Sequence, residues 1–529
     1  MPYVPSLDRS PAYARQGMVA TSQSLAVQAG LHVLREGGNA VDAAIATAVA
    51  LTVVEPVSNG IGGDAFALAR IDGETVGLNG SGRVPLLAQA PALDTVAAAF
   101  LGWHAVTVPG TPRAWADFHR RAGRLPFPRL FEPAIHYAQH GFVVTPMVAR
   151  NWAMAANRFE RARAPEVATW FAAFTHGGRV PRVGETFAQP DQAESLRAIA
   201  ASYADAFYEG DLARAIASFA SVSGGHLSEA DLATHQSDWV CPLEQRYRDA
   251  TLYELPPNGQ GIVALQALAV LEQLDVCDAT QAERTHGRIE ALKHAFADAG
   301  SRVADPATHP FDVAAMLEPD RVADARATIG PLASNPVPRR PQRGGTVYVA
   351  TADGEGGLVS WIQSNFEFFG SGVVVPGTGI ALQNRAAGFE LTDATHPNAW
   401  APGKRPYHTI MPGFFEHPER GTGPLGVIGG HMQPQGHVQL VSRLVDERLG
   451  LQEAVDAWRF QWRAGLRVDL EMHAEREVAD ALALRGHEVA YLPDTGRYDF
   501  GRAQIILRRP DGVLEGASDS RADGYAAGY

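Results

Sequence analysis

The chain has little cysteine, no long apolar run and no excess of positive charge. Its 529 residues include two cysteines, Cys241 and Cys277, which are too few for a disulfide framework, so we expect small core residues in a reducing compartment. The most apolar stretch, residues 40–54, is interrupted by Asp42 and is too short to span a bilayer. A formal net charge of −13 argues against nucleic-acid or anionic-membrane partners.

Several catalytic motifs are also missing. The sequence has no Gly-x-Ser-x-Gly elbow, no His-Glu-x-x-His zinc motif, no phosphate-binding Gly-x-x-x-x-Gly-Lys and no Cys-x-x-Cys. We therefore expect no metal and no cofactor. The first twenty residues contain no apolar run of signal-peptide length, which predicts a cytoplasmic protein. The proportions of hydrophobic residues (46%) and charged residues (19%) are ordinary for a globular protein, and the size favours an enzyme.

Helix patterns are clear near the start of the chain. Residues 24–36 carry apolar side chains at i, i+4 spacing, and a Gly-Gly pair ends the pattern. Asn39, with Asp42 three positions later, predicts the start of a second helix, whose alanine-rich sequence indicates burial on most faces. Residues 125–326 are mostly helical in pattern.

A sharp change of composition occurs at residues 335–345, NPVPRRPQRGG. Three prolines, three arginines and two glycines cannot form a core helix or a central strand, so we expect an exposed, mobile linker. Residues 346–352 then have strand composition, followed by the turn sequence Asp-Gly-Glu-Gly and a second strand pattern at 358–364. These residues predict a β-hairpin directly after the linker.

Thr346, the first residue of this hairpin, is the main catalytic candidate. A threonine hydroxyl becomes a useful nucleophile when a base removes its proton, and a threonine at a chain N-terminus can use its own α-amine. That amine has an ordinary pKa of about 7.7–8.0. An internal threonine reaches this state only if the preceding peptide bond, at Gly345, is cut. The hairpin places Thr346 opposite Gln363 and close to Ser364, within a residue or two.

The C-terminal third offers a second candidate feature. A glycine-rich loop at 429–436 precedes a predicted helix that extends to residue 449, so its backbone N–H groups could face an oxyanion. A plain connecting loop is the alternative. Another helix is expected at 451–459, and the chain ends in strand patterns at 503–507 and 513–517.

Taken together, these residues resemble the gamma-glutamyltransferase (glutathione hydrolase) family of N-terminal nucleophile hydrolases. The matching segments are spread over nearly the whole chain and are specific as a set. They are GMVA (17–20), GGNAVDAA (37–44), EP (55–56), NGIGGD (59–64), VPG (108–110), LFEPA (130–134), APGKRP (401–406), GASDSR (516–521) and AGY (527–529).

The resemblance implies a fold and a processing event. The family is translated as one chain that cuts itself before a threonine, which here is Thr346. The products would be a large subunit, 1–345, and a small subunit, 346–529, that build an α+β fold: a four-layer αββα sandwich. Ser364 lies where the family has a threonine bonded to the nucleophile.

The resemblance also assigns the oxyanion hole and shows departures at substrate-binding positions. The family's oxyanion-loop Gly-Gly falls on Met432 and Gln433, whose backbone N–H groups would keep that role. The aspartate that holds a glutamyl ammonium is replaced by Gly388. The other expected substrate-binding positions are Arg83, two residues past the family's arginine, Gln363, Phe366 in place of an asparagine, and His408 and Thr409 in place of a Ser-Ser pair.

These departures remove charge complementarity to an amino-acid head group. We expect an acidic acyl group without an ammonium to face Arg83 and a protonated His408. The predicted function is an autoprocessing, threonine-dependent amidohydrolase or acyltransferase acting on γ-glutamyl compounds or similar small acidic amides through an acyl-enzyme. An oxamate-type or cephalosporin-type amidohydrolase, and a catalytically inactive binding homologue, remain alternatives. The expected partners are a small-molecule amide and the two subunits of one precursor, and dimerisation of that unit stays open.

Overall fold

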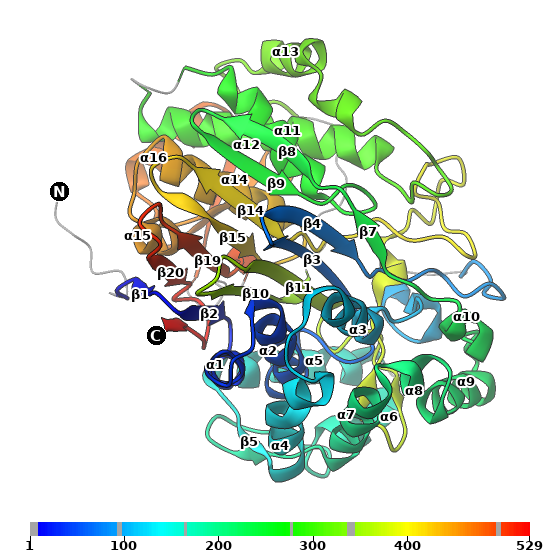
Figure 1. Ribbon diagram of the computed structural model, residues 1–529. Helices are drawn as coiled ribbons and strands as arrows, with labels where there is room; N and C mark the ends of the chain where they lie inside the picture. Colours follow the sequence, from blue (N-terminus) through cyan, green and yellow to red (C-terminus); the bar gives the residue numbers. More distant parts are fainter. Residues whose placement is uncertain (1–8, 92–97, 163–166, 276–278, 336–343, 494–498) are drawn as a thin grey trace.

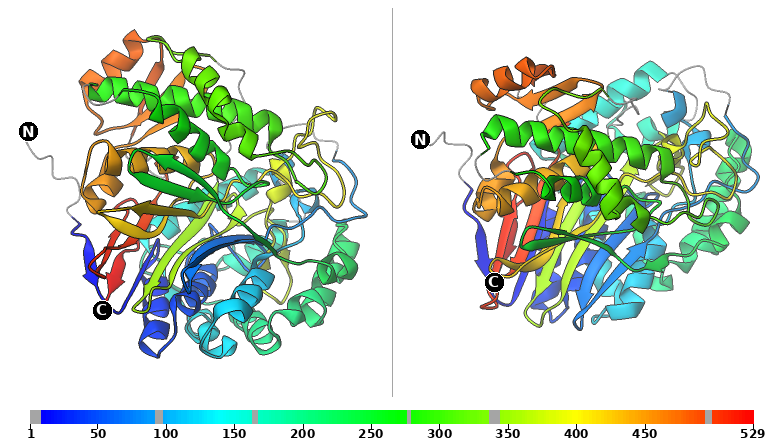
Figure 2. Two further views of the ribbon diagram at one scale, coloured as in Figure 1. Left: turned by 45° about the horizontal axis from the view of Figure 1, so that its top comes forward. Right: turned by 90° about the horizontal axis from the view of Figure 1, so that it is seen from above.

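The computed structural model describes residues 9–91, 98–162, 167–275, 279–335, 344–493 and 499–529. Two seven-stranded sheets lie face to face between two layers of helices (Figure 1). Figure 2 shows the same layers from two further directions, with the helices on the outer faces of the two sheets. This arrangement confirms the predicted α+β class and the four-layer αββα sandwich.

The first sheet carries the hairpin predicted to hold the catalytic threonine at its centre. Its strands, in spatial order, are β21 (Ala526–Gly528), β2 (Gly17–Thr21), β10 (Gly345–Asp353), β11 (Leu358–Phe366), β3 (Asp64–Ile71), β4 (Glu74–Asn79) and β7 (Asp238–Val240). All the ladders in this sheet are antiparallel. The sheet therefore contains strands from both sides of the predicted cleavage point, with β10 and β11 between β2 and β3.

The second sheet has the same mixed origin. Its strands, in spatial order, are β1 (Ala12–Ala14), β20 (Leu514–Ser518), β19 (Ala503–Arg508), β15 (Gly421–Val427), β14 (Gly413–His417), β9 (Ala250–Glu254) and β8 (Leu243–Tyr247). Apolar side chains from both sheets fill the space between them, as alternation along half-buried strands requires. They include Met18, Phe66, Leu68, Tyr348, Ile362, Phe414, Ile506 and Leu514.

Helices cover the outer face of each sheet. Those of the layer over the first sheet, from the first half of the chain, are α1 (Ser24–Arg35), α2 (Ala40–Val54), α3 (Thr111–Ala122), α4 (Glu132–His140), α5 (Pro146–Ala162), α6 (Ala168–Phe174), α7 (Pro190–Ser202), α8 (Asp205–Tyr208), α9 (Asp211–Ser223) and α10 (Glu229–Ala233). Those over the second sheet are α11 (Gly261–Glu272), α12 (Gln281–Arg302), α13 (Pro319–Thr328), α14 (Met432–Val445), α15 (Leu451–Asp456) and α16 (Arg476–Leu484).

Shorter elements connect these layers. The small sheets are β5 (Phe142–Val143) with β6 (Thr186–Phe187), β12 (Val374–Val375) with β13 (Ile380–Ala381), and β16 (Phe460–Ala464) with β17 (Arg467–Glu471) and β18 (Glu488–Leu492). The 3₁₀ turns are η1 (Ala98–Phe100), η2 (Trp103–Ala105), η3 (Phe127–Phe131), η5 (Ala314–Leu317) and η6 (Arg385–Gly388).

The predicted N-terminal helices are confirmed. The Asn39 side chain accepts a hydrogen bond from the backbone of Asp42, whose carboxylate accepts one from Asn39, so the two residues form a capping box at the start of α2. Every residue of α2 is buried, because the helix lies between the first sheet and other helices. An alanine-rich sequence suits this position because small side chains allow close packing on all sides.

The range 125–326 is mostly helical, as predicted, and it also contains the strands β7, β8 and β9 between Asp238 and Glu254. The prediction for Cys241 is wrong, because this residue is exposed and is not part of the core. Cys277 and most of the predicted linker (336–343) lie outside the described residues. No helix in the described part of the chain combines the length and apolar character needed to cross a membrane.

Candidate active site

Thr346 lies at an irregularity at the start of β10, in the middle of the first sheet. Gly345 pairs with Phe366 and Val347 pairs with Gln363, so two residues of β11 lie opposite Thr346. The prediction that Thr346 lies opposite Gln363, within a residue or two, is confirmed, since Gln363 pairs with the next residue, Val347. A bulge re-aims the side chain that it carries. The Thr346 side chain is buried, with 1% of the residue exposed.

Ser364 connects the predicted nucleophile to the bond that it would cut. The Thr346 hydroxyl donates to Ser364 Oγ at 3.3 Å, and Ser364 Oγ donates to the Gly345 carbonyl oxygen at 2.7 Å. The backbone N–H of Phe366 donates to the same Oγ at 2.7 Å and holds it in place. The predicted proximity of Thr346 and Ser364 is confirmed. The contact also polarises the carbonyl of the Gly345–Thr346 peptide bond.

The Gly-Gly pair before Thr346 is needed because the backbone approaches its neighbours closely. A Cβ on Gly344 would lie 2.9 Å from Gly430 Cα, and one on Gly345 would lie 3.2 Å from the backbone N of Phe368. The first distance is shorter than real Cβ contacts allow, and the second is tighter than most of them. The two glycines therefore let the predicted cleavage site lie directly against the glycine-rich loop.

The backbone amides assigned to the oxyanion hole are engaged in this structure. Met432 N donates to Gly429 O at 3.0 Å, and Gln433 N donates to Gly430 O at 3.1 Å. Both residues begin α14 and are fully buried. The loop lies beside the predicted cleavage site, as expected, but its two amides close a turn. Their role as oxyanion donors stays a prediction.

Gln363 has a structural environment that sequence reasoning did not anticipate. Its amide nitrogen donates to Ala48 O at 2.8 Å and to Asn59 Oδ1 at 2.6 Å. Its oxygen accepts from the indole N–H groups of Trp115 and Trp361 at 3.2 and 3.1 Å. Since neighbouring strand residues face opposite sides of a sheet, Gln363 contacts the helix layer while Ser364 contacts Thr346. All its hydrogen-bonding capacity is used, so substrate binding by Gln363 is not supported.

Arg83 is also engaged away from Ser364. Its guanidinium forms an ion pair with Asp305 at 2.8 Å and donates to Gly403 O at 3.2 Å. The side chain is 38% exposed, whereas Thr346 and Ser364 are buried. The structure therefore does not bring Arg83 to the nucleophile.

His408 is buried and neutral, which corrects the expectation of a protonated side chain. Burial lowers the pKa of His408 well below its usual value, and the positive charges of Arg385 and Arg405 lower it further. Its Nδ1 accepts from the Ile410 backbone at 3.3 Å, so the proton lies on Nε2, which donates to Asp64 at 3.2 Å. His408 thus fixes a buried carboxylate and offers no charge to a substrate.

Arg385 is a site residue that the sequence analysis missed. It lies in η6 and is fully buried, and its guanidinium donates to Thr409 Oγ1 at 2.8 Å and to Ser364 Oγ at 3.3 Å. The guanidinium carbon lies 4.1 Å from the centre of the Phe366 ring. Thr409 and Phe366 therefore do lie at the site, but as neighbours of this arginine. The sequence did contain a sign of this residue: Arg385 lies three positions before Gly388, and Gly388 is the position at which the family's aspartate is missing.

Burial lowers the pKa of Arg385 to about 9, and the charges of Asp64 and Glu367 oppose this shift. The side chain therefore stays protonated at neutral pH. Asp64 lies in the segment NGIGGD, which carries part of the family resemblance, and the sequence alone indicates no role for it. Burial raises its pKa to about 7 against the effect of Arg385, and its oxygens accept from the backbones of Gly82 and Gly110.

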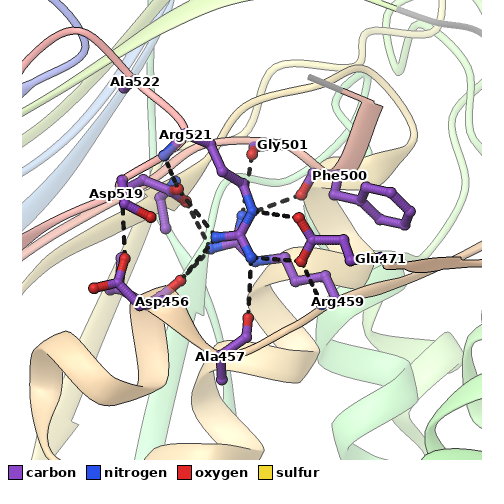
Figure 3. Close-up of polar contacts among 12 residues, drawn as sticks. Asp456, Ala457, Arg459, Glu471, Phe500, Gly501, Asp519, Arg521 and Ala522 are labelled. Carbon is purple, nitrogen blue, oxygen red and sulfur yellow. Dashed lines mark hydrogen bonds and ion pairs between the residues drawn. The ribbon is translucent and has the colours of Figure 1, made fainter. Parts of the chain in front are cut away.

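A buried ionic network, drawn in Figure 3, holds the segment at Phe500 and Gly501 that packs against the start of the glycine-rich loop. Arg459 forms an ion pair with Asp519 at 2.8 Å and donates to the carbonyl oxygens of Phe500 and Gly501, both at 3.1 Å. A Cβ on Gly501 would lie 2.4 Å from Ile428 O, which shows how closely this segment packs against the start of the loop.

Arg521 completes the network in Figure 3 by pairing with Asp519 at 3.1 Å and with both carboxylate oxygens of Glu471. Burial raises the pKa of Asp519, but Arg459 and Arg521 outweigh burial and lower the pKa below its usual range. Asp519 and Arg521 belong to the segment GASDSR, which carries part of the family resemblance. In the structure Arg521 fixes Asp519, which holds Arg459, and Arg459 in turn bonds the segment at Phe500 and Gly501 that packs against the loop.

Arg459→Met is expected to destabilise the protein by about 3–5 kcal/mol, because it leaves the buried carboxylate of Asp519 without one of its two cations. The thermal unfolding temperature measures the effect. Arg214→Met is the matched control, since Arg214 pairs with Asp211 on the surface and both side chains are exposed. Equal unfolding temperatures for the two variants would contradict a supporting role for the network.

One group of described residues has ligand atoms close enough for a metal ion: His286, Glu290 and His487, all within 4.8 Å of one another. Glu290 already pairs with the buried ammonium of Lys293 at 2.8 Å, and His286 Nδ1 and His487 Nε2 share a hydrogen bond of 2.9 Å. A cation there would be repelled by Lys293. The group is better explained as an internal ion pair, on elements other than those that carry Thr346.

Comparison with known proteins agrees with this geometry. The family model described as gamma-glutamyltranspeptidase matches residues 26–529. The chain is 35% identical to the oxamate amidohydrolase proenzyme of Klebsiella pneumoniae subsp. pneumoniae, covering 97% of this chain and 98% of that protein. It is 36% identical to the glutathione hydrolase-like YwrD proenzyme of Bacillus subtilis, with the same coverage.

A solved structure has the same fold as this chain. The crystal structure of cephalosporin acylase from Bacillus halodurans superposes with a TM-score of 0.94 and 45% sequence identity, covering 100% of this chain and 98% of that one. The fold, the buried threonine beside its serine partner and the full-length matches lead to one assignment. The chain belongs to the gamma-glutamyltranspeptidase family of N-terminal nucleophile hydrolases, as an autoprocessing amidohydrolase or acyltransferase.

Proposed function

We propose that the chain cuts itself between Gly345 and Thr346 and then hydrolyses a small acidic amide with the new N-terminal threonine. One observation carries this proposal: Ser364 Oγ accepts from the Thr346 hydroxyl and donates to the Gly345 carbonyl oxygen. Attack of Thr346 Oγ1 on that carbonyl carbon forms an ester and breaks the C–N bond, which releases the α-amine of Thr346. Water then hydrolyses the ester and leaves Gly345 with a carboxylate.

The processed threonine has the chemistry that substrate hydrolysis requires. Its free α-amine has an ordinary pKa of about 7.7–8.0 and can accept the proton of its own hydroxyl. Attack on a substrate amide gives an acyl-enzyme and releases an amine, and water or an acceptor amine then removes the acyl group. The departing end of the large subunit vacates the position of the Gly345 carbonyl, which a substrate carbonyl can then occupy beside Ser364.

We propose that residues 1–345 and 346–529 stay together as large and small subunits after cleavage. In the first sheet β10 and β11 lie between β2 and β3, and in the second sheet β14 lies between β9 and β15. Separation would break ladders in both sheets and expose the apolar core between them. The low cysteine content supports a cytoplasmic location for this unit.

The experiment examines purified protein for self-cleavage and for association of the two products. Denaturing electrophoresis is expected to show two bands, and N-terminal sequencing of the smaller band is expected to begin Thr-Val-Tyr. Native size-exclusion chromatography is expected to keep both bands in one peak. An uncut chain, or a cut at another bond, would overturn the proposal.

A further inference from the structure

We propose that Arg385 binds a carboxylate on the acyl part of the substrate, so that the enzyme prefers acidic acyl groups that carry no ammonium. The inference rests on the proposed function and specifies the substrate class of the same site. Neither the family description nor the relatives' names assign a role to this arginine. It takes the place that the sequence analysis gave to Arg83 and His408.

The first argument is the unbalanced charge of Arg385. The side chain is fully buried, yet the two groups that it bonds, the hydroxyls of Thr409 and Ser364, are neutral. Its Nε–H has no hydrogen-bond partner within the described part of the chain. A buried cation is costly without an anion, and guanidinium geometry matches a carboxylate oxygen pair. The arginine therefore suits a ligand that brings a negative charge.

The acidic side chains that influence Arg385 are already held by other groups. Asp64 accepts from His408 at 3.2 Å and from the amide of Gln383 at 3.3 Å. Glu367 pairs with Arg158 at 2.6 Å. Both carboxylates therefore have donors of their own, and the Nε–H of Arg385 stays available to a ligand.

The second argument is position. Ser364 Oγ contacts both the Arg385 guanidinium and the carbonyl oxygen of Gly345. After processing, a substrate carbonyl that replaces the Gly345 carbonyl lies two hydrogen bonds from Arg385. A carboxylate a few bonds from the scissile carbonyl can span this separation, so the acyl group is expected to be short.

The third argument is that the site cannot offer an ammonium partner where the family has one. A Cβ on Gly388 would lie 2.6 Å from the carbonyl oxygen of Tyr407, so an aspartate there would require the backbone to move. The intervening residues of η6, Ala386 and Ala387, carry no charge. An α-ammonium would instead meet the positive charge of Arg385.

A matched pair of chromogenic amides tests the inference on processed wild-type enzyme. Glutaryl-p-nitroanilide and L-γ-glutamyl-p-nitroanilide differ only in the α-ammonium, and we expect the glutaryl compound to have the higher kcat/KM. Oxamate and ethyl oxamate form a second pair that differs in the carboxylate. We expect oxamate to be preferred by about 10- to 150-fold, the range for hydrogen bonds to a charged group.

Arg385→Gln is expected to abolish the preference for oxamate over ethyl oxamate, whereas Arg385→Lys is expected to retain part of it. The ratio of kcat/KM values is the readout, because it cancels any general effect of the substitution on Ser364. Arg83→Ala is the matched control, and its ratio is expected to stay at the wild-type value. If Arg385→Gln does not fold or process, the wild-type substrate ratios still decide the question.

Two outcomes would overturn the inference. One is higher kcat/KM for γ-glutamyl-p-nitroanilide than for the glutaryl compound, and the other is an unchanged oxamate preference in Arg385→Gln. Either result in normally processed protein leaves the proposed function intact. A chain that is never cut before Thr346 contradicts the proposed function instead, so the two failures are distinguishable.

Discussion

Thr346→Ala is expected to remain a single uncut chain without amidase activity. Thr346 Oγ1 is the hydroxyl that bonds Ser364 beside the Gly345 carbonyl, and alanine removes it while keeping the backbone. The loss of activity should be about 10⁴-fold or more, as expected when a covalent nucleophile is removed. Denaturing electrophoresis and an amide-hydrolysis assay, both run beside wild type, measure the two effects.

Thr346→Ser is the matched control because it keeps a hydroxyl at the same position. It is expected to process and to retain activity, with altered rates. Gly345→Ala is a second control, since its Cβ would lie 3.2 Å from Phe368 N and should slow processing by displacing the carbonyl. Unimpaired cleavage of Thr346→Ala would contradict the assignment of the nucleophile.

Ser364→Ala is expected to slow both self-processing and turnover, each by roughly 10- to 1,000-fold, the range for removal of one positioned donor. The substitution removes the hydroxyl that polarises the Gly345 carbonyl and accepts from Thr346. It also leaves the Phe366 N–H without its acceptor, which should cost about 1–3 kcal/mol of stability. The rate of band conversion in freshly purified precursor gives the processing effect, and kcat of the processed enzyme gives the other.

Ser364→Thr is the matched control, because it keeps the hydroxyl and adds only a methyl group. It restores the residue type that the family resemblance places here, so processing and turnover are expected to exceed those of Ser364→Ala. Wild-type rates in fully processed Ser364→Ala would show that the hydrogen bond to the Gly345 carbonyl has no kinetic role.

The substrate-binding residues show why motif positions alone were insufficient. The family pattern directed attention to Arg83, two positions from the expected arginine, and the structure pairs it with Asp305. A different arginine, Arg385, reaches the site because η6 folds against the end of β11. Both arginines have the same charge. What differs is burial, which is a property of packing.

Local sequence was enough to predict the hairpin of β10 and β11, a helix start at Asn39 and Thr346 as the main catalytic candidate. These features depend on alternation, on cap chemistry and on motifs within a few residues of one another. The family resemblance extended this to the four-layer fold. The sequence thus determined the class of chemistry, and it predicts the bond to be cut.

Only the tertiary structure decided which charged side chains lie beside Ser364 and Thr346. The bulge at the start of β10 sets which residues of β11 lie opposite Thr346, alternation along β11 turns Gln363 toward the helix layer, and burial makes His408 neutral. Each of these results depends on contacts between segments far apart in the chain. Exposure, hydrogen-bond partners and protonation follow from such contacts, because the surroundings of a side chain, and not its own identity, set the free energy of its charge.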